Sequence, residues 1–410
     1  MPERAASRKC RGGNGTVTTE PFEAWLRDRR ASPEWFCFIK RLAANDTLAT
    51  GSHQAGPYLP KNVAFRLFPS ISDPGLQNPD AYLTAIIDSH DQPGVNVRIT
   101  WYNGRTRDEC HITRWGGKNS PLLDPDATGS IAVFAFRKVE SRDADACLVW
   151  ICNLEEEELL EGYVGTIEPG APLFLESGLK PASVVDTGHI PSCWLTPETI
   201  PAEWQERFPS GATIVERCVT LRPLVGLSAD KRLIGRRQCE YEMFRSIEQI
   251  VVLPRISRGF SSVDDFINYS NAVSNRRKSR SGRSLELHLA RLFEEEGVKH
   301  SHGEVSEGAK KPDFLFPSAE HYRRGESPLW MLAAKTTCKD RWRQILNEAD
   351  RIPVKHLATL QEGVSCNQYD EMRKAGVRLV VPEPLHTRYP REIRPELLTV
   401  GQFISMVKSG

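Results

Sequence analysis

Hydrophobic and polar positions follow different patterns in the two halves of the chain. Between residue 22 and about residue 180, short apolar runs of strand length alternate with clusters of turn-forming residues, as at 81–87, 95–102, 131–136 and 147–152. This spacing predicts a β-rich barrel or sandwich. From Trp204 onward the apolar residues recur at helical spacing, with two short strand-like runs among the helices. The second half is therefore expected to be an α/β domain. Its predicted helices include 240–253, 263–273 and 284–296.

Two polar segments separate these patterned regions. Residues 1–21 are rich in Gly, Ser, Thr and Arg, which indicates a flexible N-terminal lead. Residues 181–205 are rich in proline, serine and threonine, which indicates a linker. The predicted domains are therefore 22–180 and 206–410, and each is long enough to bury its own core.

Three groups suited to phosphodiester hydrolysis occur on successive elements of the second half. Asp313 stands at the start of a short apolar run bounded on both sides by proline, which suits a strand. Lys335 ends a second apolar run, and the segment after it changes to helical spacing and reaches Glu348. Phosphodiester hydrolysis needs oxygen ligands for Mg²⁺, an activated water and positive charge near the developing negative charge. Asp313, Glu348 and Lys335 can supply these, so the segment predicts a nuclease site.

One position departs from the usual Pro-Asp…Asp/Glu-x-Lys nuclease pattern. In that pattern a second carboxylate lies two residues before the lysine on the same strand, but here the position holds Ala333. A helix packed against the strand can direct Glu348 at the same point. We therefore expect Glu348 to replace the missing ligand.

The chain resembles the EcoRII-like type IIE restriction endonucleases from about Phe36 to the C-terminus. The likeness lies in the phrases IKRL at 39–42, NDT at 45–47, ITRWG at 112–116, SNRRKSR at 274–280, SLELHL at 284–289 and KTTCKDRWRQILNEAD at 335–350. The resemblance implies a multi-domain protein, with an N-terminal β-barrel of the B3-like DNA-binding pseudobarrel type and a C-terminal α/β restriction-endonuclease-like (PD-(D/E)xK) domain.

The same resemblance implies an activity and its partners. A homodimer would cleave double-stranded DNA at CCWGG sites with Mg²⁺, after stimulation by a second copy of the site bound to the N-terminal domain. A cognate DNA methyltransferase would be a functional partner without being a physical one.

Particular residues of the second half receive roles from the resemblance. Lys339, Asp340 and Arg341 match the tripeptide with which similar enzymes read the outer base pairs. The two cations can donate to guanine O6 and N7, and the carboxylate can accept from cytosine N4. The alternative for Asp340 is that it begins the following helix. Arg237 aligns with an arginine that stacks on the central base, which these enzymes extrude from the duplex.

Four further residues receive expected roles from the resemblance. Arg277 and Lys278 belong to a basic run before the helix predicted at 284–296, and they are expected to contact phosphates. A solvated helix start is the alternative for such a run. Similar enzymes place a supporting carboxylate at the position of Glu286. Tyr322 matches a position near the scissile phosphate, and packing in the core is an equal alternative.

In the first half, the resemblance draws attention to two polar loops. One contains His53 and Tyr58, and the other contains Arg105, Arg107, Glu109 and His111. In similar enzymes these loops are arms that hold effector DNA in its major groove, whereas by themselves they would be ordinary surface loops. Cys110 and His111 depart from the basic residues expected at their positions.

Composition agrees with this interpretation but does not lead to it. The chain has 54 Lys and Arg against 53 Asp and Glu, so a DNA-binding surface must come from local clusters. The ten cysteines include no C-x-x-C pair and no Cys/His ligand spacing, which predicts reduced thiols without disulfides or structural zinc. No apolar run approaches the length of a membrane span, so the expected location is the prokaryotic cytosol, with no membrane partner. The acidic run at 155–158 is expected to be a solvated surface.

Two other functions stay open on the sequence alone. A repair or mismatch-directed nuclease with the same core chemistry would cut at lesions or mismatches instead of intact CCWGG. A DNA-binding regulator with a degenerate nuclease core would bind without cutting, although the complete set of Asp313, Lys335 and Glu348 argues against it.

Overall fold

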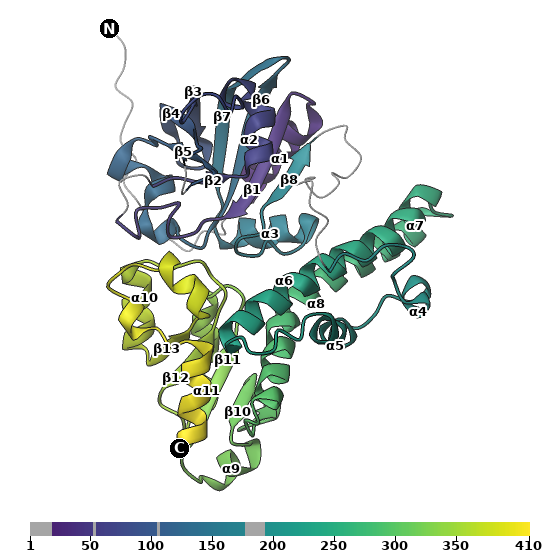
Figure 1. Cartoon of the computed structure of the whole chain (residues 1–410), viewed down its shortest axis with the longest axis vertical. Coiled ribbons are helices and arrows are strands. Elements are labelled where there is room, and N and C mark those ends of the chain that lie inside the picture. Colours follow the sequence, from purple (N-terminus) through teal and green to yellow (C-terminus); the bar gives the residue numbers. More distant parts are fainter. Residues whose placement is uncertain (1–18, 52–54, 105–106, 177–192) are drawn as a thin grey trace.

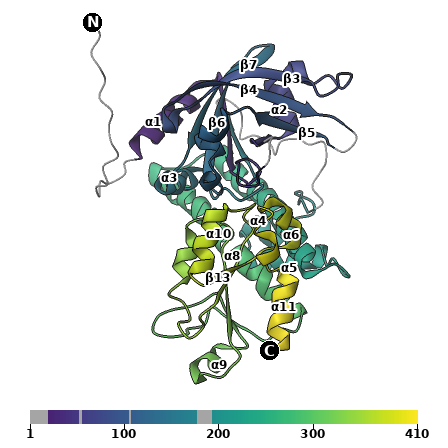
Figure 2. The same cartoon turned by 90° about the vertical axis from the view of Figure 1, so that its left-hand side faces the viewer.

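The computed structural model describes residues 19–51, 55–104, 107–176 and 193–410. A sheet domain built from the first half lies against a mixed helical and sheet domain built from the second half (Figures 1 and 2). The expected N-terminal lead and the first part of the expected linker lie almost entirely outside the described residues. Within the described part of the chain, no helix is both long and apolar enough to cross a membrane.

The N-terminal domain is a curled eight-stranded sheet with the order β2-β5-β4-β3-β7-β6-β1-β8. Neighbouring strands are antiparallel except β3 and β7, which are parallel. Its strands are β1 (Trp35–Arg41), β2 (Tyr58–Leu59), β3 (Asp80–Ile87), β4 (Gln92–Tyr102), β5 (Glu109–Thr113), β6 (Ile131–Val139), β7 (Arg142–Ile151) and β8 (Leu173–Glu176). Its helices are α1 (Glu20–Ala31), α2 (Lys61–Leu67) and α3 (Leu154–Val164), with short 3-10 turns at Pro69–Ile71, Asp88–His90, Gly117–Asn119, Pro121–Leu123 and Pro125–Ala127. The predicted β-rich domain is confirmed.

Alternation along the strands explains how this sheet builds two cores. In β6, Ala132, Phe134 and Phe136 face the inside of the curl, while the residues between them pack against α1 and α3 on the outer face. Because helices cover the outer face, β6 is buried on both sides and its sequence is almost continuously apolar. Each fully buried Phe stabilises the domain by about 1.5–3 kcal/mol relative to exposure.

The prediction that the acidic run at 155–158 is a solvated surface is wrong for two of its members. Glu156 and Glu157 are buried on α3, where Asn153 and Glu156 form a reciprocal N-terminal cap. Glu157 pairs with the buried guanidinium of Arg41 at 2.7 Å and accepts a hydrogen bond from the Ile131 amide at 2.9 Å. A charge run on one face of a helix gives no sign that an arginine from a distant strand neutralises it.

The C-terminal domain contains a five-stranded sheet with the order β13-β12-β11-β10-β9. The pairs among β9, β10 and β11 are antiparallel, and those among β11, β12 and β13 are parallel. The strands are β9 (Ser301–His302), β10 (Phe314–Phe316), β11 (Trp330–Ala334), β12 (Lys355–Ala358) and β13 (Val377–Val380). The helices are α4 (Ala202–Glu206), α5 (Gly211–Leu221), α6 (Ala229–Ile247), α7 (Leu253–Arg258), α8 (Val263–Glu295), α9 (Ala319–Arg324), α10 (Cys366–Lys374) and α11 (Val400–Ser409). Shorter helical turns are the π turn Glu248–Val252 and the 3-10 turns Arg341–Ile345, Glu383–Arg388 and Arg394–Glu396.

Helices α6 and α8 lie side by side and extend from this domain as an arm that ends at α7 (Figure 1). The prediction of separate helices at 263–273 and 284–296 is wrong, because α8 is continuous over 33 residues. Ser262 caps its N-terminus by accepting a hydrogen bond from the Asp265 amide. The basic run therefore lies in the middle of a helix and not at a helix start.

The expectation of cysteines without disulfides is also wrong for one pair. Cys193 and Cys239 form a disulfide, with their Cα atoms 5.1 Å apart. The residues are separated by 46 positions, so no local motif announces the pairing. The described end of the expected linker belongs to the C-terminal domain, because its residues Cys193, Leu195 and Trp204 pack against Cys239 and Met243 of α6.

Candidate active site

Asp313 and Lys335 meet because β10 and β11 are neighbours in the sheet. Asp313 precedes β10 and Lys335 follows β11, and the antiparallel register pairs Phe314 with Leu332. One carboxylate oxygen of Asp313, Oδ2, accepts hydrogen bonds from the Ala334 amide at 2.8 Å and from Lys335 Nζ at 3.2 Å. The carboxylate and the ammonium predicted from the sequence are therefore brought together.

Glu348 joins them from a turn and not from a helix, which corrects the predicted secondary structure. The helical segment ends after the 3-10 turn Arg341–Ile345, and Ala349 adopts a φ of 49°. A left-handed residue cannot continue a right-handed helix. The apolar residues whose spacing predicted a helix are still buried in the core, although the segment is a 3-10 turn followed by an irregular turn. They are Trp342, Ile345 and Ala349.

Burial dominates the electrostatics of Glu348. It raises the pKa of this carboxyl to about 7, and the negative charge of Asp313 adds to that effect while Lys335 opposes it. Glu286 on α8 acts in the same direction as Asp313, which places it near the cluster, and its Oε2 lies 3.5 Å from His302 Nε2. Oε2 of Glu348 is buried without a hydrogen-bond partner among the described residues.

The donor set fits a hard divalent cation. Among the described residues, no three His, Cys, Asp or Glu side chains are already gathered as a metal site. Mg²⁺, however, keeps several of its waters and usually binds through one or two carboxylates. Asp313 and Glu348 supply two, and the unpartnered Oε2 of Glu348 is a buried acceptor that such an ion would satisfy.

Tyr322 lies on the buried face of α9, with 1% of its surface exposed. Its hydroxyl donates to a carboxylate oxygen of Glu307 and accepts from the Arg351 amide at 3.2 Å. Burial and the Glu307 carboxylate raise the pKa of Tyr322 to about 12. These contacts correspond to the packing alternative, and a role beside the scissile phosphate stays a prediction.

The candidate recognition tripeptide lies directly beneath the N-terminal domain. Lys339 Nζ donates to the hydroxyl of Ser130, and the Lys339 amide donates to Gln361 Oε1 at 3.1 Å. Arg341 is exposed. Asp340 precedes the 3-10 turn but makes no capping hydrogen bond, so the alternative role as a helix start has no support in its contacts.

Arg237 lies in a buried cluster of charges that joins the two domains. Its guanidinium donates to Glu168 of the N-terminal domain at 2.9 Å and to Glu240 at 3.1 Å. Arg280 on α8 donates to the same two carboxylates. Arg237 and Arg280 are about 5% and 7% exposed, so in this arrangement Arg237 is closed off from any nucleic acid.

The two predicted phosphate contacts on α8 have different surroundings. Arg277 is held by Glu248 through two hydrogen bonds of 2.7 and 3.0 Å, and it donates to the carbonyl of Val164 in the N-terminal domain at 3.2 Å. Lys278 is exposed. A phosphate contact by Arg277 would therefore compete with Glu248 and with the Val164 carbonyl of the N-terminal domain.

Four of the six predicted effector residues line a cavity of about 590 Å³ between the domains. Tyr58 and His111 pair across β2 and β5 with their rings 5.4 Å apart, and Glu109 lies 3.2 Å from His111. Arg107 and Glu109 line the same cavity, together with Arg388 and Glu362 of the C-terminal domain. His53 and Arg105 lie outside the described residues.

Cys110 differs from its neighbours on β5. Its side chain is 0% exposed in the core of the curled sheet, because strand residues alternate between faces. Its neighbours Glu109 and His111 line the cavity and Cys110 does not, so Cys110 cannot take the place of a basic residue that contacts DNA.

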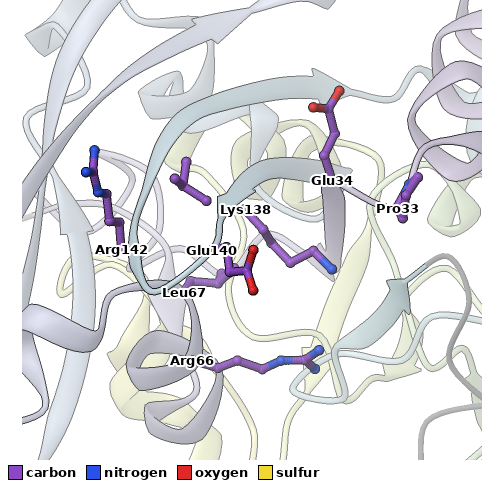
Figure 3. A pocket seen from close by; sticks show the side chains of 8 residues that line it. Pro33, Glu34, Arg66, Leu67, Lys138, Glu140 and Arg142 are labelled. Carbon is purple, nitrogen blue, oxygen red and sulfur yellow. The ribbon is translucent and has the colours of Figure 1, made fainter.

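Another cavity, of about 310 Å³, lies elsewhere in the N-terminal domain (Figure 3). Arg66, Lys138 and Arg142 line it, together with the carboxylates of Glu34 and Glu140. None of these residues belongs to the predicted sites, and the mixture of both charges gives the cavity no clear preference for a ligand.

Several residues of functional interest were missed in the sequence. Ser130 and Glu168 contact the predicted DNA-reading residues from the other domain, and Glu307 and Lys355 surround the turn after Glu348. Each lies in a loop or at a strand end without a motif. Such residues are identified only by their partners in space.

Comparisons with known proteins agree with this architecture. The model of the EcoRII C-terminal domain matches residues 244–404, and that of the restriction endonuclease EcoRII N-terminal domain matches residues 31–178. The type II restriction enzyme EcoRII of Escherichia coli is 47% identical over 396 residues, which cover 94% of this chain and 96% of that enzyme.

Solved structures show weaker likeness. A complex of the restriction endonuclease PspGI with substrate DNA has a TM-score of 0.42 and 16% identity, covering 52% of this chain and 97% of that one. Metal-depleted Ecl18kI with uncleaved, modified DNA has a TM-score of 0.43 and 18% identity, covering 50% of this chain and 80% of that one.

The two matched domains and the 47% identity to EcoRII show that the chain is a type II restriction endonuclease, an enzyme that binds and cleaves DNA. Two domains are present, a curled N-terminal sheet and a C-terminal nuclease domain. The chain belongs to the EcoRII family.

Proposed function

We propose that this restriction endonuclease cleaves double-stranded DNA at CCWGG-like sites with Mg²⁺, and that a second site bound to the N-terminal domain activates it. The observation that supports the chemistry most is the convergence of Asp313, Lys335 and the unpartnered Glu348 carboxylate from three separate elements. Asp313 and Glu348 would hold the cation, with Glu286 as a supporting carboxylate beside them. Bound Mg²⁺ would supply an acidified water and neutralise charge on the phosphate.

Lys335 has the position required of the cationic group. Its ammonium is 3.2 Å from the Asp313 carboxylate, and 22% of its side chain is exposed, so it can reach a phosphate while staying fixed by Asp313. From there it can orient the attacking water and stabilise the negative charge that develops on the phosphate oxygens.

Sequence recognition would come from the loop after β11. Lys339, Asp340 and Arg341 follow Lys335 by only a few residues, so base contacts and chemistry would be coupled through one short segment. Arg341 and Asp340 are exposed, and a Lys, Asp and Arg set offers the donors and the acceptor that a GG:CC half-site presents. Arg237 would stack on an extruded central base, and Arg277 and Lys278 would contact phosphates.

The contacts between the domains support an inhibited resting state. Lys339 donates a hydrogen bond to Ser130, and Arg237 donates one to Glu168. Arg277 donates one to the Val164 carbonyl. Substrate cannot use these three side chains until the domains separate. Effector DNA can activate the enzyme only if it binds the open arrangement more tightly than the closed one.

The position of the predicted effector residues, between the two domains, supports activation by domain opening. The cavity that contains Tyr58, Arg107, Glu109 and His111 is also lined by Glu362 and Arg388 of the catalytic domain. The closed cavity is too small for a duplex, so DNA bound by these residues would have to separate groups of the two domains, which disfavours the closed arrangement. His53 and Arg105 are proposed as further contacts on the same two loops.

A homodimer is proposed on the basis of the helical arm. Exposed apolar residues gather around α7 and the start of α8, where Ile256, Val263, Phe266 and Ile267 are 52%, 73%, 50% and 46% exposed. A second copy packed there would cover this apolar surface, and two catalytic centres would suit cleavage of both strands. A methyltransferase that protects host sites is the functional partner.

Cleavage mapping tests the proposed function. DNA of known sequence is digested with the purified protein and Mg²⁺, and the ends are sequenced, with Lys335→Ala as the control. Ends confined to CCWGG-like sites, and absent with the variant, are the expected result. Cutting of mismatched duplexes in preference to intact CCWGG would favour the repair nuclease, and binding without cutting would favour the DNA-binding regulator.

A further inference from the structure

The backbone immediately after Glu348 has an unusual conformation. Ala349 adopts a φ of 49°, in the left-handed region that a residue with a Cβ atom seldom occupies. Its side chain is fully buried, so the turn cannot relax without disturbing the core. Such conformations persist only where surrounding groups impose them, and they gather at functional sites. The groups that impose this one therefore also decide where the Glu348 carboxylate points.

Lys355 holds the carbonyl groups of the turn. It lies at the start of β12 and is 5% exposed. Its ammonium donates to the Ala349 carbonyl at 2.6 Å and to the Ile352 carbonyl at 2.7 Å. A buried ammonium is costly unless it is hydrogen-bonded, so these two main-chain bonds fix the lysine and the turn together.

Glu307 holds the amide groups from the opposite side. Its Oε1 accepts a hydrogen bond from the Asp350 amide at 2.8 Å. Its other carboxylate oxygen accepts from the hydroxyl of Tyr322, and that hydroxyl accepts in turn from the Arg351 amide at 3.2 Å. The carbonyls of Ala349 and Ile352 and the amides of Asp350 and Arg351 are thus bonded to side chains outside the turn.

We propose that Lys355 and Glu307 are positioning residues that fix the turn at 349–352 and thereby direct the Glu348 carboxylate toward the cation site. This inference rests on the proposed function, because it takes Glu348 as a metal ligand. Groups that orient a metal ligand typically contribute about 10- to 100-fold to metal affinity or activity. Neither residue belongs to the predicted DNA-reading segment, so their loss should leave DNA binding unchanged.

The chain offers a matched control for this test. Lys310 Nζ lies 2.6 Å from the Asp350 carboxylate and 3.9 Å from Glu307 Oε1, so it contacts the same turn and the same carboxylate through side chains and not through the main chain. Lys355→Met and Glu307→Ala are therefore compared with Lys310→Ala in the full-length protein. Amide hydrogen exchange of the peptide covering residues 346–354, without metal, reports the turn directly. The Mg²⁺ concentration for half-maximal cleavage and the dissociation constant for a CCWGG duplex in chelator are measured beside it.

The two positioning variants should exchange faster in this peptide, need about tenfold more Mg²⁺ and cut about 10- to 100-fold more slowly at saturating Mg²⁺. Their dissociation constants in chelator should match the wild type, and Lys310→Ala should resemble the wild type throughout. The proposal is overturned if both variants exchange and respond to Mg²⁺ as Lys310→Ala does.

The experiment also covers a variant that fails to fold, and it distinguishes failure of this inference from failure of the proposed metal site. If Lys355→Met does not fold, as judged by its melting transition, Glu307→Ala decides the question alone, because the Glu307 side chain is 32% exposed and its removal leaves the core intact. Glu348→Ala is measured in the same series. Normal cleavage by Glu348→Ala would refute the proposed metal site itself, whereas an inactive Glu348→Ala beside normal positioning variants refutes only the present inference.

Discussion

Replacement of Glu348 by glutamine should abolish cleavage and at the same time stabilise the protein at high pH. The carboxyl is buried near Asp313, and its pKa is raised from 4.5 to about 7. Ionising it in the folded protein without a cation costs about 3 kcal/mol by that difference. Because the side chain keeps some contact with solvent, a gain of about 1–2 kcal/mol is the better expectation.

The direction of the pH dependence follows from proton binding. Between pH 4.5 and about 7 the folded protein keeps a proton on Glu348 that the unfolded chain has released, so rising pH destabilises the wild type over this range. Glutamine does not titrate. The advantage of Glu348→Gln should therefore be absent near pH 4.5 and fully developed above pH 7.

Calorimetric unfolding in the presence of a chelator measures this effect at pH 5 and pH 8.5. A stabilisation of 1–2 kcal/mol should raise the melting temperature of a domain of this size by about 3–6 °C. Glu371→Gln is the control, because Glu371 carries an exposed carboxylate in the same domain. The claim that burial raises the pKa of Glu348 would be refuted by either of two results. One is an equal melting temperature for Glu348→Gln and wild type at pH 8.5, and the other is a gain of the same size at both pH values.

Three other variants test the remaining parts of the site. Lys335→Ala should lower the single-turnover cleavage rate by at least about 10²- to 10³-fold, while DNA binding in Ca²⁺ persists; near-normal cutting would overturn its assignment. Arg341→Ala should lose about 1–3 kcal/mol of binding free energy at a cognate duplex and much less on random DNA, and equal losses in a competition assay would identify a phosphate contact instead. Glu168→Gln removes the carboxylate that holds Arg237 at 2.9 Å, so cleavage of single-site DNA should rise about tenfold; an unchanged rate would show that this contact does not hold the closed state.

Local patterns predicted the parts of the fold that depend on local physics. Short apolar runs of strand length identified β3, β4, β6 and β7, because each of these strands has at least one buried face. Asp313 and Lys335 could be paired because β10 and β11 are close in sequence and adjacent in the sheet. The helix predicted around Glu348 is wrong, since nothing in an alanine indicates the left-handed conformation of Ala349.

Contacts between distant segments could not be predicted in this way. The ion pair of Glu168 with Arg237 joins residues 69 positions apart, and the disulfide joins residues 46 positions apart. The acidic run that contains Glu157 looks solvated until Arg41 is placed beside it. In each case the partner lies on another element, and the sequence around either residue is equally compatible with exposure to solvent.

Cleavage of a plasmid with one CCWGG site, by the full-length protein and by a protein that begins at Cys193, tests the central account most directly. The shorter protein keeps the disulfide and the packing on α6 but lacks Ser130, Val164 and Glu168. It should cut the single site faster than the full-length protein and should not respond to an added CCWGG duplex, whereas full-length protein should be stimulated by that duplex. Equal rates for both proteins, with no response to the duplex from either, would contradict a nuclease site held closed by its N-terminal domain.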